Sequence, residues 1–527
     1  MKLPLSVPSL AVTPDDHQFS EATRLLTRGD LAQAQAIFED LLRRHPNHFD
    51  CVRRLAMIAL ETGRYADAVS LCCQALEINP SSAETYIDMG SAMLGLGQAQ
   101  AALECLDAAI QLDGTAAQAH NNRGLALKEL GRLQDAEACY QQAIALDAGS
   151  KEAWLNLGVV QRQLNHHDAA LVSYAHAIAL QADYARAYVN SGLVLHDLGR
   201  LSEAIAQFDT ALRIQPGMGE AFWNKALALL TLGDYRAAWP LYEWRWINHS
   251  AAPPSPDSTP PLWDGSAPLS GKRILVQCEQ GLGDTIQFCR YLPLLADLGA
   301  EVIFEAYAPL VGLMQSLTGV AKVIPHNTVY DAVDYRVLLM SLPMVFGTTV
   351  STVPVSGRYL SAPPDTVRKW SSRLGPSQRM RVGLVWRGSP SHQDDRKRSL
   401  ALEPLLAHLP PEFDYVSLQF QPSASEQATL AQYPVIEPAA DIVDFSDTAA
   451  ICAQLDLVIS VDTSVAHLSG ALGIPCWILV THSADWRWLM DRSDCVWYPK
   501  TRIYRQLEAG NWDSALQAVA SDLLSVP

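Results

Sequence analysis

The chain has 527 residues, which is too many for one hydrophobic core and corresponds to about three domains. Its formal net charge of −17 argues against a general binder of nucleic acids or anionic membranes, and no uninterrupted apolar run reaches membrane-spanning length. Ten Cys residues without a CxxC pair fit free thiols in a reducing cytoplasm and predict no metal site.

The N-terminal half begins with a segment, residues 1–15, that lacks the long apolar stretch of a secretory signal, so we expect a disordered leader. Residues 16–248 then repeat at a period of 34, with seven units. A glycine column, an alanine column without exception and a column of large residues run through the units. The glycine column consists of Gly29, Gly63, Gly97, Gly131, Gly199 and Gly233, with Asn165 in the fifth unit. This pattern resembles tetratricopeptide repeats and predicts an all-α superhelix of helical pairs with a concave binding face.

One further column is polar and lies on the first helix of each pair. It contains Asn122, Asn156, Asn190 and Asn224, with Asp88 one unit earlier. A side-chain amide can both donate to and accept from a peptide backbone. The column resembles the asparagine ladder of the O-GlcNAc transferase repeats, which implies that these four residues bind an acceptor polypeptide. The alternative is that each Asn bonds a neighbouring turn inside the array.

The repeats end in an aromatic cluster, Trp239 to Trp246, which we expect to seal the last unit against the C-terminal half of the chain. Residues 249–271 are rich in Pro and Ser and predict a semi-rigid linker. Strand and helix patterns then alternate, which predicts an α/β fold with parallel sheets. We place a first lobe at 272–376 and a second at 377–527, divided at a polar stretch.

The most informative stretch of the second lobe runs from Val458 to Pro475. It reads as a buried strand, a turn of Asp462, Thr463 and Ser464, and a helix. The helix N-terminus would favour an anionic ligand, above all a diphosphate, although an ordinary βα unit has the same pattern. The sequence from Asp462 to Pro475 resembles the nucleotide-sugar signature of the heptosyltransferase-like glycosyltransferases (family nine). That resemblance implies a GT-B fold of two facing Rossmann-like domains, with a nucleotide-sugar bound between them.

The first lobe opens with a strand at Arg273–Gln277, a glycine turn at Gly281–Asp284 and a predicted helix at Thr285–Leu298. Gly271-Lys272, before the strand, does not fit a Walker loop, and the turn does not fit a dinucleotide fingerprint. A carboxylate at this place can accept the proton of an attacking hydroxyl. The turn also resembles the glycine-acid turn of the heptosyltransferases, which implies that Asp284 is the catalytic base. A helix cap is the alternative, because a helix N-terminus lowers the pKa of an Asp.

A cationic cluster follows the predicted strand that starts at Arg381. Arg387, Arg396 and Arg398 are expected to neutralise the diphosphate leaving group, unless the loop is merely solvated and paired with its own Asp residues. His392 beside these Asp residues is not expected to hold a metal. The resemblance implies further contacts with the donor. These involve Gly283, Trp386, Gln419, Asp462, Thr463, Ser464 and His467.

The resemblance as a whole implies a cytoplasmic, bacterial-type protein glycosyltransferase that is metal-independent, inverting and without a cofactor. It would move a sugar from a nucleotide-sugar to a protein hydroxyl, with flagellin as one candidate acceptor. Two alternatives stay open. One is a transferase acting on a lipid-linked or envelope saccharide. The other is a non-catalytic repeat scaffold with a degenerate transferase lobe, which the unusual Phe420-Gln421 after Gln419 favours.

Overall fold

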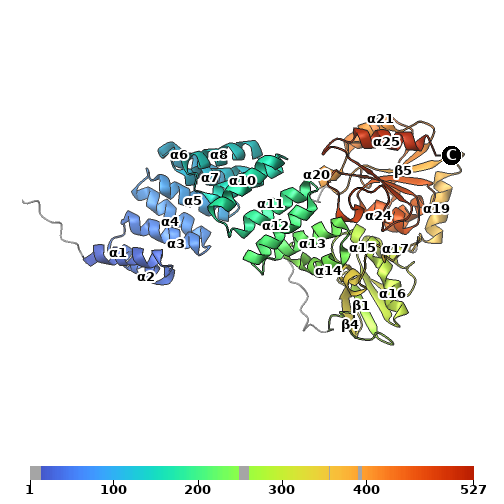
Figure 1. Ribbon diagram of the computed structural model, residues 1–527, viewed down its shortest axis with the longest axis horizontal. Coiled ribbons are helices and arrows are strands. Elements are labelled where there is room, and N and C mark those ends of the chain that lie inside the picture. Colours follow the sequence, from blue (N-terminus) through green and yellow to red (C-terminus); the bar gives the residue numbers. More distant parts are fainter. Residues whose placement is uncertain (1–13, 249–259, 355–356, 390–394, 527) are drawn as a thin grey trace, which may run out of the picture. The chain divides into compact units, whose positions relative to one another are not determined.

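A computed structural model describes residues 14–248, 260–354, 357–389 and 395–526, apart from the side chains of residues 247, 248, 396 and 397 (Figure 1). Residues 1–13 of the predicted leader and residues 249–259 of the predicted linker therefore lie outside the described residues. The last two residues expected in the leader, Pro14 and Asp15, instead begin helix α1 (Pro14–Thr27). The chain forms two compact units, which divide between Val194 and Leu195. The division falls inside a repeat helix, α11 (Ala185–Asp197), and not at the Pro- and Ser-rich segment.

Helical pairs make up the first half of the chain, as the period of 34 predicts. Within the first unit, each pair packs on the next one along the chain. The helices of the repeats are α1 (Pro14–Thr27), α2 (Leu31–Arg44), α3 (Phe49–Glu61), α4 (Tyr65–Ile78), α5 (Ala83–Gly95), α6 (Ala99–Leu112), α7 (Ala117–Glu129), α8 (Leu133–Leu146), α9 (Lys151–Gln163), α10 (His167–Leu180), α11, α12 (Leu201–Ile214), α13 (Gly219–Leu232) and α14 (Tyr235–Tyr242). A short 3-10 helix, η1 (Glu243–Asn248), follows α14.

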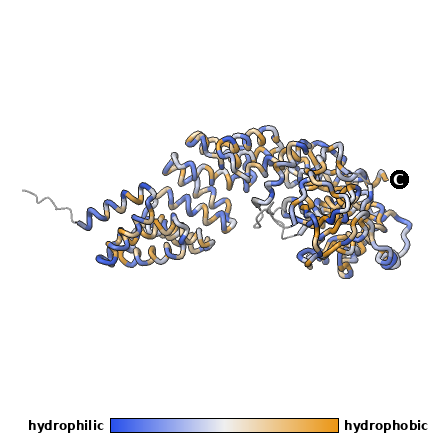
Figure 2. Tube along the Cα trace, turned by 90° about the horizontal axis from the view of Figure 1, so that it is seen from below, coloured by the Kyte–Doolittle hydropathy of each residue, from blue (hydrophilic) through white to orange (hydrophobic). Residues whose placement is uncertain are grey.

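The turn column of the repeats has the left-handed backbone that its glycines predict. The glycine φ values in this column run from 71° to 84°, and Asn165, the substitute in the fifth unit, has φ 62°. Asn is one of the few other residues that tolerate this conformation. The alanine column is fully buried at every position from Ala34 to Ala238, which lets the paired helices approach closely. Hydrophobic and hydrophilic stretches alternate along these helices (Figure 2).

The second unit contains two parallel sheets. The first has the strand order β3-β2-β1-β4. Its strands are β1 (Arg273–Gln277), β2 (Glu301–Ala306), β3 (Val320–Pro325) and β4 (Tyr335–Leu338). The helical segments around it are α15 (Leu282–Phe288), η2 (Cys289–Tyr291), α16 (Leu292–Asp297), η3 (Ala308–Leu310), α17 (Val311–Met314), η4 (Leu339–Ser341) and α18 (Leu342–Val345).

The second sheet has the strand order β10-β9-β8-β5-β6-β7 and is also parallel. Its strands are β5 (Arg381–Val385), β6 (Asp414–Ser417), β7 (Val435–Ile436), β8 (Leu457–Val461), β9 (Cys476–Val480) and β10 (Thr501–Arg505). The helical segments around it are α19 (Pro364–Leu374), α20 (Asp395–Arg398), α21 (Leu402–His408), α22 (Ala424–Leu430), η5 (Ala439–Asp441), α23 (Phe445–Cys452), α24 (Ser464–Ala471), η6 (Trp486–Trp488) and α25 (Asp513–Leu523).

Three local features differ from the sequence prediction. The single helix expected at 285–298 is divided into α15, η2 and α16, because Pro293 lacks an N–H group and begins a new helix. The described end of the expected linker is packed. Trp263 is buried there, and its backbone N–H donates to the Arg336 carbonyl at 2.8 Å. Helix α19, expected in the first lobe, packs on α23, where Trp370 donates to Asp447 at 2.7 Å.

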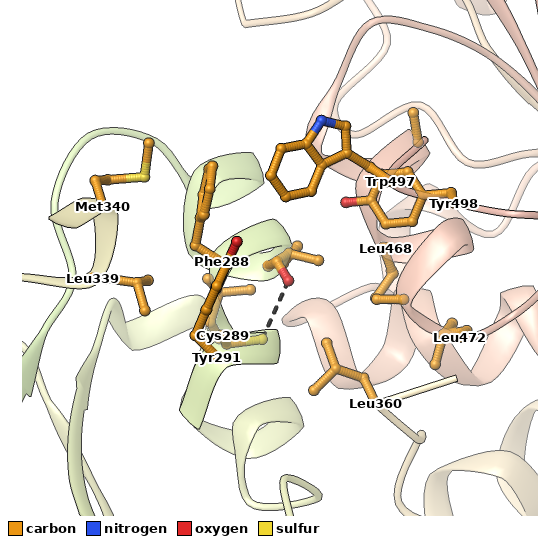
Figure 3. Packing of buried hydrophobic residues seen from close by; sticks show 14 of the residues in the cluster. Phe288, Cys289, Tyr291, Leu339, Met340, Leu360, Leu468, Leu472, Trp497 and Tyr498 are labelled. Atoms are coloured by element: carbon orange, nitrogen blue, oxygen red, sulfur yellow. Dashed lines mark hydrogen bonds between the residues drawn. The ribbon is translucent and has the colours of Figure 1, made fainter. Parts of the chain in front are cut away.

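One large apolar cluster joins the two sheets with the last repeat. It includes Trp239 on α14, Phe288 on α15, Leu468 on α24 and Trp497. Figure 3 shows part of this cluster, with Phe288 and Tyr291 of the first lobe opposite Leu468, Trp497 and Tyr498 of the second. A second cluster lies on the other face of the six-stranded sheet, against α21 and α25. The two lobes are therefore held against each other by a continuous hydrophobic core.

Candidate functional site

The predicted site residues lie at the ends of particular strands. In doubly wound sheets, ligands bind outside the carboxyl ends of the strands, at the point where the strand order reverses. That point lies between β1 and β4 in the first sheet and between β5 and β8 in the second. Gly283 and Asp284 follow β1, Trp386 and Arg387 follow β5, and residues 462–464 follow β8. Each of these groups therefore lies at a reversal point.

The turn after β8 leads directly into α24. Thr463 is the N-cap residue with extended backbone, and no side chain in the described part of the chain caps this helix. The Thr463 hydroxyl instead lies 3.1 Å from that of Ser460. Backbone N–H groups at the start of a helix attract an anion through their positive partial charge. This end of α24 can therefore accept a phosphate or another anionic group.

His467 lies on α24 where the two lobes meet. Its Nδ1 is 2.9 Å from the Tyr498 hydroxyl, and its ring stacks on Trp488. A Cβ atom on Gly283 would lie only 2.9 Å from His467 Cδ2, so the glycine turn and α24 touch here. Burial lowers the pKa of His467 well below its ordinary value, and the nearby Arg487 lowers it further. The imidazole is therefore neutral at physiological pH.

Asp284, the expected base, is engaged with both of its carboxylate oxygens. Oδ2 accepts the Gly281 N–H at 2.8 Å, which caps α15, and Oδ1 is paired with the Arg487 guanidinium across the lobe boundary. Arg487 also donates to Gln287 at 2.6 Å and to Asp485 at 2.9 Å. In this conformation Asp284 acts as a helix cap and an ion-pair partner.

Asp462 is in a different electrostatic environment. Burial and the nearby Asp485 raise its pKa to about 6, although the charges of Arg487 and Arg398 oppose this increase. Its Oδ1 lies 3.9 Å from His467 Nε2. Strand β5 pairs with β8, with Val385 opposite Ser460, so the loop after β5 begins beside the turn after β8. Asp284 and Asp485 both pair with the buried Arg487, whose charge also lowers the pKa of Asp462.

The loop after β5 is fixed by a set of internal hydrogen bonds. Gln419 accepts the backbone N–H groups of Trp386 and Arg387 at 3.3 and 3.1 Å. Glu426 accepts the Trp386 indole N–H at 2.6 Å and Arg387 Nε at 2.8 Å. Burial alone would raise the pKa of Glu426, but the hydrogen bonds from Arg387, Ser423 and Trp386 lower it to about 2. Arg387 and Gln419 are thus both engaged in bonds between the loop after β5 and the segment after β6.

The remaining cationic residues are placed only in part. Arg398 Nε lies 3.4 Å from Asp395 Oδ1, and both side chains pack against Gly388, where a Cβ atom would clash with them. The side chain of Arg396 lies outside the described residues, and so does His392. Among the residues that the structure describes, no group of three or more metal-ligating side chains is present.

The asparagine column makes hydrogen bonds within the repeats. Asn122 is buried and donates to the Ser91 hydroxyl at 2.9 Å, and Asn156 donates to Asn121 at 3.1 Å. Asn224 donates to the carbonyl of Glu220 one turn earlier, at 2.9 Å. Asn190 is half-buried on α11. An amide has more donors and acceptors than these bonds use, so the column retains capacity for a polypeptide.

Two residues of the site were not predicted from the sequence. Arg487 stands between two tryptophans, Trp486 and Trp488, and nothing in its sequence neighbourhood indicates a partner 203 residues away. Glu426 had a local signal, because Ser423 and Glu426 form a capping box at the start of α22. That signal predicts a helix start but not the pairing with Arg387.

Comparisons with known proteins identify the repeats. One tetratricopeptide-repeat family model matches residues 19–83 and 155–219, and two others match residues 59–122 and 117–149. Tetratricopeptide repeats are therefore present, and repeats of this kind bind peptides or protein partners. No helix among the described residues is long and apolar enough to cross a membrane.

Individual relatives match parts of the chain. Protein FlbA of Caulobacter vibrioides is 28% identical over 315 residues, which are 54% of this chain and 52% of the relative. Tetratricopeptide repeat protein 7B of Homo sapiens is 31% identical over 78 residues, 15% of this chain and 9% of that protein. The chain thus spans about half or less of the length of these curated relatives.

Solved structures resemble the repeats. The crystal structure of MamA is 28% identical and covers 30% of this chain and 92% of its own, with a TM-score of 0.28. YrrB, described as a tetratricopeptide-repeat protein with an unusual peptide-binding site, is 20% identical and covers 36% of this chain and 98% of its own, with a TM-score of 0.31.

Proposed function

We propose that this protein is a glycosyltransferase that moves a sugar from a nucleotide-sugar to a hydroxyl group of a polypeptide held by the repeats. The observation that carries the proposal is the meeting of two sheet reversal points in one compact unit. The glycine turn after β1 touches the start of α24, which follows β8. A nucleotide-sugar between two such sheets would have its diphosphate at the α24 N-terminus and its sugar toward the first lobe.

The transfer step needs an acceptor oxygen, a leaving group and a proton acceptor. The acceptor hydroxyl oxygen forms a bond to the anomeric carbon of the sugar, while the bond from that carbon to the phosphate oxygen breaks. The nucleotide leaves with the electron pair, and its negative charge is stabilised by α24 and by nearby cations. The hydroxyl proton passes to a carboxylate of the chain.

Arg487 links the binding of the donor to the availability of Asp284. A bound diphosphate would compete with Asp284 for the Arg487 guanidinium, because phosphate also binds this group through paired hydrogen bonds. Once Arg487 turns to the phosphate, Asp284 Oδ1 is free to accept the proton of the acceptor hydroxyl. Asp284 would thus serve as the proton acceptor only when the donor is in place.

Calorimetric titration with UDP, ADP, GDP, CMP and dTDP tests the donor site. We expect one nucleotide to bind the wild-type chain and to bind Ser464→Asp at least tenfold more weakly, because the new carboxylate takes the anion position at the start of α24. Ala83→Asp is the matched control, since it places the same charge at the first residue of α5, whose N-cap residue is Ser82. Absence of binding by every nucleotide to a folded wild-type chain would refute the proposal.

A specific observation favours a second function, a non-catalytic protein-binding scaffold. Asp284 and Arg387 are both engaged in bonds within the chain, as expected for residues with a structural role. The same titration separates the two functions, because a scaffold has no need to distinguish one nucleotide from the others. Release of nucleotide from the matching nucleotide-sugar, measured without an acceptor, would exclude the scaffold.

A further inference from the structure

The seventh repeat is built into the transferase-like unit by a buried ion pair. Arg245, on η1 directly after α14, has a side chain with no exposed surface. Its Nε and Nη2 atoms donate to both carboxylate oxygens of Glu279, each at 2.8 Å. Its remaining bonds go to Glu243 at 2.7 Å and to Ser341 at 3.0 Å. Each nitrogen of this guanidinium therefore donates at least one hydrogen bond, and two carboxylates balance its buried charge.

Glu279 lies two residues before the candidate catalytic turn, Gly281–Asp284. It follows β1 by two residues, is buried, and also accepts the Met340 backbone N–H at 3.0 Å. The next residue, Gln280, has φ 61°, which is an uncommon conformation for a side chain of this kind. Gln280 in turn accepts the hydroxyl of Tyr242, on α14, at 3.3 Å. Two consecutive residues at the entry of the turn are thus held from the seventh repeat.

Aromatic packing connects the same repeat to the other half of the site. Tyr235, Trp239 and Tyr242 all lie edge-on to Trp486, the residue before Arg487. The Trp497 indole N–H donates to the Tyr235 hydroxyl at 3.0 Å. Both partners of the Asp284–Arg487 ion pair therefore follow segments that contact α14 and η1.

We propose that the seventh repeat positions the Gly281–Asp284 turn for catalysis, with Arg245 and Tyr242 as its positioning residues. The proposal rests on the glycosyltransferase function proposed above. A strained conformation such as that of Gln280 persists only where surrounding contacts fix it. The Arg245–Glu279 pair fixes the backbone before the strained residue, and Tyr242 holds its side chain. The repeat thereby determines where the Asp284 carboxylate stands relative to the acceptor hydroxyl.

The test compares Arg245→Lys and Tyr242→Phe with wild type in the full chain. The assay is nucleotide release from UDP-, GDP-, ADP-, dTDP- and CMP-sugars, with water as the acceptor, and calorimetry counts the nucleotide sites in each sample. Lys cannot make the two-pronged contact of Arg, and Phe removes only the hydroxyl. Arg123→Lys is the control, because Arg123 pairs with Asp107 at 2.6 Å within the repeats.

We expect kcat per nucleotide site to fall at least tenfold in Arg245→Lys and two- to tenfold in Tyr242→Phe. The nucleotide Kd should stay within twofold of wild type in both, since neither Arg245 nor Tyr242 is hydrogen-bonded to α24 in the part of the chain that the structure describes. Arg123→Lys should match wild type in every readout. A purely structural role would lower the number of binding sites and leave kcat per site unchanged.

The outcomes separate this proposal from the function on which it rests. An unchanged kcat per site in Tyr242→Phe overturns the positioning role. This holds whether Arg245→Lys is also unchanged or does not fold. The glycosyltransferase function is not affected by that result. An equal fall in kcat for Arg123→Lys overturns the positioning role as well. Wild-type protein that binds no nucleotide and releases none from any sugar donor overturns the function itself, and the positioning role with it.

Discussion

Replacement of Gly470 by Ala should loosen the contact between α24 and Tyr498. Gly470 lies under the Tyr498 ring, where an added Cβ atom would be 2.7 Å from Cε1 and would clash with Cδ1 and Cγ. Tyr498 is 2% exposed, so its ring has no free space into which it can move. Any displacement also lengthens the 2.9 Å bond between the Tyr498 hydroxyl and His467.

The magnitude is the sum of three contributions. Overpacking of a closed core costs about 1–3 kcal/mol. Separation of a buried hydroxyl from its imidazole partner costs about 1–3 kcal/mol more. The higher helix propensity of Ala returns up to about 1 kcal/mol. The free energy of unfolding of the second unit, residues 195–527, should therefore fall by about 1–6 kcal/mol, which corresponds to a decrease of about 1.5–9 °C in Tm for a unit of this size.

Tryptophan fluorescence is a suitable assay, because 12 of the 13 tryptophans lie in the second unit and only Trp154 lies before residue 195. Thermal unfolding of Gly470→Ala should be compared with that of Gly217→Ala, since a Cβ atom at Gly217 meets no heavy atom within 4 Å. A Tm for Gly470→Ala within 1 °C of the control would refute the packing argument.

Two further predictions concern pH. Burial raises the pKa of Asp88 to about 6, with Arg53 opposing, so its charge destabilises the fold above pH 6 and has no effect below about pH 4. Asp88→Asn should raise the free energy of unfolding by about 1–3 kcal/mol at pH 7.5, measured by circular dichroism, and equal stability at pH 7.5 would contradict this. The charge of Glu426 has the opposite effect on stability. Its pKa is lowered to about 2, so the charged form stabilises the fold, and this stabilisation is fully present above about pH 4.5. Glu426→Gln should lose about 1–3 kcal/mol at pH 7 and less at pH 3, and a loss independent of pH would show that the charge of Glu426 is not the cause.

The repeat architecture was predictable because its contacts are local and periodic. Each turn needs a left-handed residue every 34 positions, so the column alone located the turns, and Asn165 kept the conformation where Gly was missing. The strand at Arg273–Gln277 was likewise readable from its apolar β-branched pattern. The break of the following helix was not predicted, although Pro293 was a visible signal for it.

The interior of the candidate site was less predictable for a physical reason. Its residue types could be placed at the ends of strands, because parallel topology brings carboxyl ends to one edge. Asp284 and Arg487 are 203 residues apart, and their pairing depends on how the two lobes pack. No periodic pattern in the sequence predicts such a contact. Arg245 and Glu279 follow the same logic, since each looks like an ordinary surface charge until the fold buries both.

The apolar cluster shared by α14, α15 and η6 limits where recombination can exchange the repeats without exposing buried residues. The Pro- and Ser-rich segment after residue 248 looks like the seam between two modules. A recombination event there would strip Tyr235, Trp239 and Tyr242 from the lobes and leave their aromatic partners facing water. Exchange of the more N-terminal repeats keeps that surface covered. We therefore expect the two lobes and the last repeat to be inherited as one unit. Variation in the number of repeats is expected N-terminal to that last repeat.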